Sequence, residues 1–226
     1  REIVTRMLAE QAAPVSTAPA KIQAGTALTD ITEEDISKWD FVHGVKAREF
    51  DALKSRTPAR LAVGHVGTRY ATHTRLRFLA DHAAAKDAVE SELPEDFIKQ
   101  YSLPVLQSLC ASRAEYITRP DLGRQLTPES AAALRGLISG AADVCVFLAD
   151  GLSAKAIIQN GMDTLLTAKA GLEAAGLRVA PAFVVRYGRV GVMDAVAQTL
   201  QCPVTCVLIG ERPGLGVADS MSAYAA

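Results

Sequence analysis

The sequence predicts an α/β fold: an open parallel sheet in the C-terminal part, a helical N-terminal portion and a flexible N-terminal arm. Short apolar runs without polar alternation recur in the last hundred residues, and helical patterns separate them. An Ala/Pro/Ser-rich segment separates the first residues from the rest of the chain. With 226 residues, 49% of them hydrophobic, the chain can bury one good-sized core.

Charge and cysteine content exclude several classes of protein. The 24 basic and 25 acidic residues nearly balance, so no net field favours nucleic acid or an anionic membrane as a partner. The apolar runs are too short for a bilayer and no signal peptide opens the chain, so we expect a cytoplasmic protein. Four cysteines without close CxxC spacing predict reduced core thiols rather than a disulfide framework or a zinc site.

The N-terminal arm, residues 1–55, begins with apolar residues at helical spacing over 1–11, which predict a short amphipathic helix. Residues 12–25 cannot bury enough surface to become ordered and are expected to form a flexible linker. The helix would then be presented like a docking peptide; the alternative, that it packs on its own domain, stays open. From 29 to 57 we expect only short helices.

Residues 56–226 are expected to form one α/β domain, with a helical part over 56–128 and a parallel sheet over 129–226. A helical stripe over 68–93 is stopped by Pro94, and a further helix over 94–110 contains Pro104, which should break or kink it. The basic start of the first helix favours a solvated or partner-facing flank over a phosphate site. The runs 142–150, 178–188 and 202–211 predict strands joined by helices over 153–176 and 192–201.

Each predicted strand is followed by a glycine-containing polar loop: 150–153, 186–191 and 210–216. Because the strands are parallel, the three loops should emerge at the carboxyl edge of the sheet, where open α/β sheets bind ligands. We expect Asp150, Arg189 and Glu211 to rim one crevice and Pro213 to stiffen its last wall. The alternative for each single loop is a plain turn.

The loops carry no recognisable catalytic set. The G-x-G of residues 214–216 lacks the third glycine of the dinucleotide fingerprint, and no Walker A lysine is present. All four histidines precede the predicted strands and are expected to lie away from their loops, which leaves no nucleophile–base pair there. The residues themselves therefore predict a binding edge without catalytic apparatus.

Several ordered motifs resemble the small subunit of ethanolamine ammonia-lyase, and the agreement spans essentially the whole chain. They are DLGRQL (121–126), ADGLSAKAI (149–157), RYGRV (186–190), GERPGLG (210–216) and SMSAY (220–224). The resemblance implies a Rossmann-like α/β part that packs on a large TIM-barrel subunit, with adenosylcobalamin between them. It further implies that the large subunit carries the catalytic groups that convert ethanolamine to acetaldehyde and ammonia by radical deamination.

The same resemblance implies cobalamin contacts at Val190 and Glu211, with Gly188 allowing close approach of the corrin ring. A third family contact, a cysteine beyond the SAY segment, has no counterpart because this sequence stops at Ala226, so the C-terminal end is expected to be missing. No D-x-H-x-x-G string occurs, which favours a base-on cofactor. Family members occur in bacterial microcompartments, which suggests the shell as a further partner.

Two other functions stay open at this point. One is a standalone Rossmann-like nucleotide-binding protein or oxidoreductase. The other is a structural adaptor whose N-terminal helix targets a shell and whose ligand crevice is vestigial. Dependence of ethanolamine turnover on a large partner subunit would distinguish a lyase small subunit from both of these alternatives.

Overall fold

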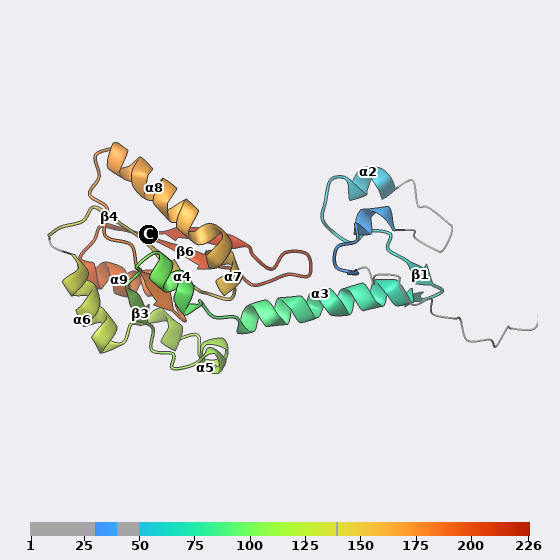
Figure 1. Ribbon diagram of the computed structural model, residues 1–226, viewed down its shortest axis with the longest axis horizontal. Helices are drawn as coiled ribbons and strands as arrows, with labels where there is room; N and C mark the ends of the chain where they lie inside the picture. The colour runs from blue at the N-terminus through green and yellow to red at the C-terminus, as the bar shows by residue number, and fades with distance from the viewer. Residues whose placement is uncertain (1–29, 40–49, 139) are drawn as a thin grey trace, which may run out of the picture.

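The structure, a computed structural model, describes residues 30–39, 50–138 and 140–226 (Figure 1). The N-terminal helix and linker expected over 1–25 lie outside the described residues. The elements are, in chain order, η1 (Ile36–Lys38), α2 (Asp51–Lys54), β1 (His65–Val66), β2 (Arg69–Tyr70), α3 (Thr72–Glu90), α4 (Glu95–Gln100), β3 (Val105–Gln107), α5 (Arg113–Thr118), η3 (Leu122–Arg124), α6 (Pro128–Leu137), β4 (Val144–Ala149), α7 (Ala154–Ala156), η4 (Ile157–Gly161), α8 (Met162–Ala174), β5 (Val184–Arg186), α9 (Val192–Leu200), β6 (Val204–Gly210) and β7 (Met221–Ala225).

The main sheet has five strands in the order β3–β5–β4–β6–β7. The first four are parallel, and β7 pairs antiparallel with β6 at the far edge. From β4 the chain crosses to β5 on one side, and from β5 it returns to β6 on the other side of β4. The connections after β4 and β6 lead in opposite directions, toward β5 and toward β7. The carboxyl ends of these two strands therefore mark a topological switch point, the usual ligand position in open α/β sheets.

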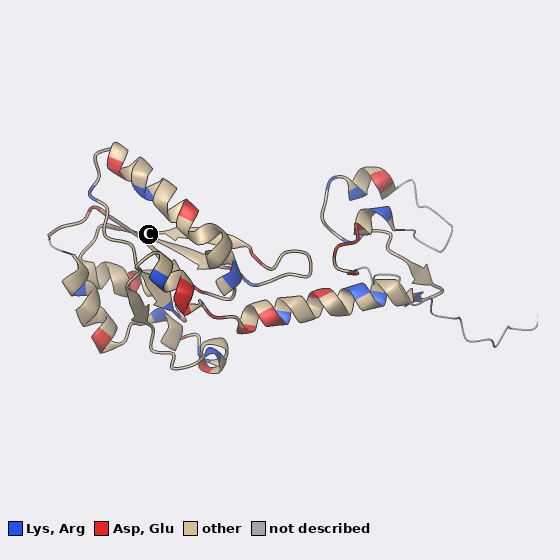
Figure 2. Ribbon diagram, in the orientation of Figure 1, with Lys and Arg blue, Asp and Glu red and all other residues tan. Residues whose placement is uncertain are grey.

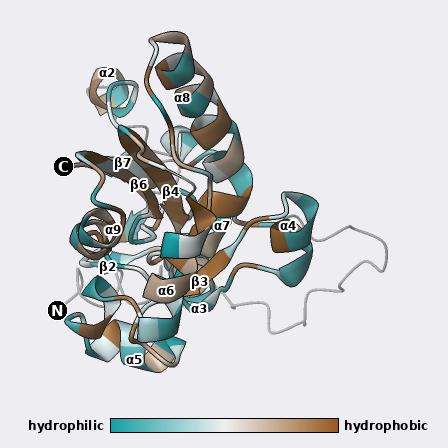
Figure 3. Cartoon of the chain, turned by 90° about the vertical axis from the view of Figure 1, so that its left-hand side faces the viewer, coloured by the Kyte–Doolittle hydropathy of each residue, from teal (hydrophilic) through white to brown (hydrophobic). Residues whose placement is uncertain are grey.

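Helices cover both faces of the sheet, which explains why β4 reads as an unbroken apolar run. Alternate residues of β4 enter two separate cores: Phe147 packs with Leu134 of α6 and Val196 of α9, whereas Val146 and Leu148 pack with residues of α4 and α8. All six residues of β4 are buried. Figure 3 shows the strongly hydrophobic colouring of β4 and β6 between the flanking helices.

The three strands expected from the sequence are confirmed as β4, β5 and β6, and the helices between them as α7–α8 and α9. For the segment 94–110 the predicted helix and its break before Pro104 are confirmed, but the prediction was wrong for the residues after Pro104. There α4 ends at Gln100, and Val105–Gln107 forms β3, which pairs in parallel with β5. Pro104 cannot continue a helix, and the residues after it are free to join the sheet edge. The sheet therefore begins inside the segment 56–128 that we expected to be helical.

Helix α3 is a long rod that extends from the sheet to a small N-terminal part (Figure 1). A β1–β2 hairpin precedes it, and Pro94 follows it as the N-cap of α4. In Figure 2 the ribbon of α3 is coloured basic near its N-terminal end and carries acidic positions from its middle to its C-terminal end. Across the described ranges, no helix is both long enough and apolar enough to cross a bilayer. All four cysteines are free thiols, three of them buried and Cys206 half-buried, as expected.

Candidate functional site

The loops after β4 and β6 are locked together at the carboxyl edge by two glycines. The Leu152 amide donates to the Gly210 carbonyl oxygen at 2.9 Å. Gly151 has φ +56°, and a Cβ there would lie 2.2 Å from the Gly210 oxygen. A Cβ on Gly210 would lie 2.1 Å from the Ser153 carbonyl oxygen. Only glycine fits such an approach of two backbones.

Asp150 does not rim a crevice as the sequence suggested, because its side chain is buried beneath the loops. Its Oδ1 accepts the Tyr187 backbone N–H at 2.7 Å, which ties the loop after β4 to the loop after β5. Burial raises the pKa of Asp150 to about 7, against the opposing effects of Arg113 and of backbone N–H groups. Asp150 is therefore a positioning residue for the RYGRV segment.

Tyr187, the second residue of that segment, is held in the left-handed region with φ +55°. Ser108, just past β3, donates its hydroxyl to the Tyr187 carbonyl oxygen at 2.8 Å. The Tyr187 hydroxyl donates to Glu92, and burial together with this bond raises the pKa of Tyr187 to about 12. Loops after three neighbouring strands thus fix the conformation of RYGRV.

Arg189 turns back toward the protein and does not point into a crevice. Its Nη2 donates to the Tyr116 carbonyl oxygen at 2.6 Å, and its guanidinium carbon lies 4.4 Å from the centre of the Tyr116 ring. The Arg189 amide donates to the Gly123 carbonyl at 2.7 Å, and a Cβ on Gly123 would lie 2.5 Å from Arg189 Cγ. Through these contacts the DLGRQL and RYGRV segments pack on each other.

Val190 and Glu211 follow strands on opposite sides of β4. Val190 is half-buried and packs on the core beneath α9. Glu211 is half-buried, its amide donates to the Ser220 carbonyl at 2.9 Å, and its Oε1 accepts the Tyr224 hydroxyl at 2.7 Å. This bond to Glu211 raises the pKa of Tyr224. Strand β7, which the sequence reading missed, thus supports Glu211 through the SMSAY motif.

A hollow of about 410 Å³ lies at the switch point, beside the loop that carries Glu211. Its walls are the second half of α3, Leu152 after β4, Ile117 of α5, and Arg212 and Pro213 after β6. Pro213 lines this hollow, but Asp150, Arg189 and Glu211, which were expected to rim the same crevice, do not. His82 also lines the hollow, so the expectation that every histidine lies away from the strand loops was wrong. Sequence separation hid this proximity, because the β6–β7 loop extends from the sheet toward α3 (Figure 1).

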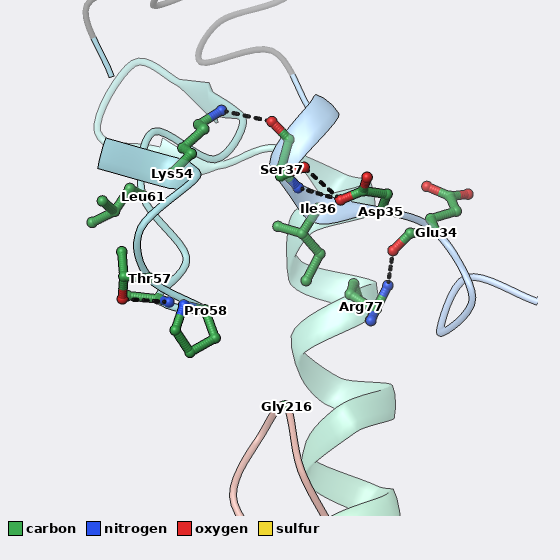
Figure 4. Close-up of a pocket in the computed structure, with 11 residues that line it drawn as sticks. Glu34, Asp35, Ile36, Ser37, Lys54, Thr57, Pro58, Leu61, Arg77 and Gly216 are labelled. Carbon is green, nitrogen blue, oxygen red and sulfur yellow. Dashed lines mark hydrogen bonds between the residues drawn. The ribbon is translucent and has the colours of Figure 1, made fainter. Parts of the chain in front are cut away.

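The tip of the β6–β7 loop is tied to the N-terminal part through a buried carboxylate on α3. Asp81 accepts hydrogen bonds from both Arg60 and Arg77, and Arg60 also donates to the Leu215 carbonyl at 2.9 Å. A second pocket, of about 280 Å³, lies between the segment 34–37, Lys54, Arg77 and Gly216 (Figure 4). Lys54 and Arg77 already donate to backbone carbonyls, so this pocket offers few free polar groups.

The described edge offers binding groups rather than reactive ones. Within the described ranges, no cluster of three or more His, Cys, Asp or Glu side chains could hold a metal ion. His82 is exposed, and its ring stacks on Phe78 with centroids 6.2 Å apart. The one buried acid at the edge, Asp150, is occupied by backbone donors.

Comparisons with known proteins show which family this chain resembles. Residues 47–226 match the family described as ethanolamine ammonia-lyase light chain (EutC). The ethanolamine ammonia-lyase small subunit of Clostridium tetani is 42% identical over 232 residues, covering 100% of this chain and 79% of the relative. The small subunits of Fusobacterium nucleatum and Clostridioides difficile are 47% and 45% identical, over 87% and 88% of this chain and 67% and 68% of theirs.

Proposed function

The chain belongs to the ethanolamine ammonia-lyase small-subunit family, a component of a lyase holoenzyme, and from this premise we propose that its carboxyl edge binds adenosylcobalamin against the large subunit. One observation carries the proposal. RYGRV and GERPGLG follow β5 and β6, the two parallel neighbours of β4, so both motifs lie on the same edge of one sheet. Ligands of open α/β sheets bind at that edge.

The residues present fit a corrinoid. A corrin is a broad apolar ring fringed by neutral amides, and its nucleotide tail carries a ribose. Glu211 has one carboxylate oxygen engaged by Tyr224, and its other oxygen can accept an amide N–H or a ribose O–H. Val190 is partly exposed and apolar. Gly151 and Gly210 bring the loops so close that a side chain at either position would push them apart.

When bound, adenosylcobalamin supplies the radical chemistry, and the protein supplies position and exclusion of water. In this proposal Glu211 and Val190 hold the cofactor. Three other residues fix the loop that carries Val190: Asp150, Ser108 and Arg189. The substrate-binding groups reside on a large TIM-barrel subunit, which converts ethanolamine to acetaldehyde and ammonia. The cofactor stays base-on. We place the enzyme in the cytoplasm, within a bacterial microcompartment, with residues 1–11 as the docking peptide.

The dinucleotide alternative is not favoured by the geometry. The G-x-G of residues 214–216 lies in a loop between β6 and the antiparallel strand β7. The Rossmann fingerprint requires a turn from a strand into a helix, whose N-terminus faces the pyrophosphate. The strand order leaves no such helix after β6.

Co-expression with the large subunit tests the proposal. We expect the complex to retain cobalamin through gel filtration and to turn over ethanolamine, whereas either subunit alone does neither. Retention of cobalamin by the large subunit alone, with the same affinity as the complex, would contradict the proposed role of this chain. Binding of NAD or ATP by the isolated chain would instead support the nucleotide-binding reading.

A further inference from the structure

The hollow between α3 and the β6–β7 loop combines an apolar floor with opposed cations. Its apolar lining comes from Val89 on α3, Leu152, Ile117 and Pro213. Lys86 projects from α3 and Arg212 from the β6–β7 loop, so the two cations belong to opposite walls. Both are exposed, and neither makes an ion pair or a side-chain hydrogen bond within the described part of the chain. The one carboxylate in the lining is Glu90 at the end of α3.

A buried guanidinium, that of Arg113, lies behind the same wall and is ion-paired with Asp150, with 4.0 Å between its Nη1 and the Asp150 Oδ2. Arg113 has a side chain that is 6% exposed, and it donates to the carbonyls of Val89 and Gly151. Val89 lines the hollow, and Gly151 directly precedes Leu152, which also lines it. The Nη2 of Arg113 has no hydrogen-bond partner among the described residues. The two unpaired surface cations on opposite walls, Lys86 and Arg212, favour an anion between them.

We propose that this hollow binds the phosphodiester of the cofactor's nucleotide tail, with Lys86 and Arg212 as its charge partners. The inference rests on the proposed function, because it assigns a part of the same cofactor to a second place on the edge. Arg212 directly follows Glu211 in the chain, so Glu211 and one wall of the hollow belong to the same β6–β7 loop. The phosphodiester is the anionic group of an otherwise amide-rich ligand, and cations opposite each other can clamp it.

The test uses two corrinoids that differ in the tail. Cobalamin carries the nucleotide with its phosphodiester, and cobinamide lacks it. We measure the affinity of the two-subunit enzyme for each by equilibrium dialysis, for wild type and for the double variant Lys86→Gln, Arg212→Gln. Because exposed ion pairs are weak, we expect cobalamin affinity to fall about threefold to tenfold and cobinamide affinity to stay unchanged. The salt dependence of cobalamin binding should flatten in the variant.

Two further variants complete the test: one removes a negative charge from the hollow, and a control removes positive charges elsewhere on the protein. Glu90→Gln removes the carboxylate of the hollow and should raise cobalamin affinity by roughly twofold, with cobinamide again unaffected. The control Arg135→Gln, Lys169→Gln removes two cations from α6 and α8, outside the hollow, and should change neither affinity.

Equal losses of cobalamin and cobinamide affinity in the double variant, or no loss at all, would overturn the phosphodiester site while leaving the proposed function intact. Wild-type enzyme that binds neither corrinoid would instead overturn the proposed function itself.

Discussion

Gly210 offers a direct test of how the carboxyl edge is built, because its substitution by alanine should force the loops after β4 and β6 apart. The added Cβ would lie 2.1 Å from the Ser153 carbonyl oxygen and 2.6 Å from the Asp150 carbonyl oxygen. An ordinary carbon–oxygen contact is roughly 3.3 Å, so the backbones must separate by about 1 Å. Separation would also stretch the 2.9 Å hydrogen bond from Leu152 to Gly210.

The expected loss of stability combines these two effects. Overpacking against backbone costs about 1–3 kcal/mol, and loss of one backbone hydrogen bond about 0.5–1.5 kcal/mol, so we expect roughly 2–4 kcal/mol. Gly171 in α8 is the matched control, because a Cβ there meets nothing within 4 Å. Gly171→Ala should therefore stabilise the helix by about 0.5–1 kcal/mol.

Amide hydrogen exchange of the two-subunit enzyme, followed by mass spectrometry, reports both changes locally. Gly210→Ala should lower protection in peptides that cover β4 and β6, and should weaken cobalamin binding, whereas Gly171→Ala should raise protection in α8 and leave binding unchanged. Unchanged protection of β4 and β6 in Gly210→Ala would refute the close packing of these loops as the basis of the edge.

Three further predictions concern acidity, the axial ligand and the arm. The pKa of Asp150 is raised to about 7 in the folded state, so its contribution to the free energy of unfolding is fully present below about pH 4 and is lost as pH rises through about 7, by at most about 4 kcal/mol. Urea unfolding should therefore show a stability that falls with pH across this window, and Asp150→Asn should remove this dependence on pH. The spin-resonance spectrum of Co(II) cobalamin should not change on ¹⁵N-histidine labelling, and a change that disappears in His82→Ala would disprove base-on binding. Deletion of residues 1–20 should preserve holoenzyme activity and abolish encapsulation, and undiminished encapsulation would show that this segment is no docking peptide.

The central strands could be predicted because burial on both faces leaves a simple pattern. Strand β4 is an unbroken apolar run, and its flanking helices end at recognisable breakers such as Gly176. Strand β3 is three residues long and follows a helical pattern, so nothing local distinguishes Val105–Gln107 from the end of a helix. Strand β7 is mostly exposed and its residues, MSAYA, form no buried apolar run, so its pairing with β6 is what makes it a strand. The order of the strands in the sheet could not be predicted, because it depends on tertiary contacts and not on local sequence pattern.

The candidate site was predictable as a location but not in its details. Parallel strands fix which loops share an edge, and this is why RYGRV and GERPGLG could be placed together. Whether a loop side chain points outward or back depends on its partners, and Asp150 and Arg189 turn inward to Tyr187 and Tyr116. The contacts of Arg113 could not be predicted from the sequence, because they form only where α5 approaches the end of α3.

Binding of the cofactor by Glu211 at the carboxyl edge can be measured as the cobalamin affinity of the Glu211→Gln variant. Gln keeps the shape and can still accept from Tyr224, but it replaces the carboxylate with a neutral amide. Loss of a charged hydrogen bond costs about 1.5–3 kcal/mol, so cobalamin affinity of the reconstituted enzyme should fall roughly ten- to a hundredfold. The KM for ethanolamine at saturating cofactor should not change, and the control Glu173→Gln on α8 should change neither quantity. Unchanged cobalamin affinity in an intact Glu211→Gln complex would show that GERPGLG is a structural turn and would contradict the account.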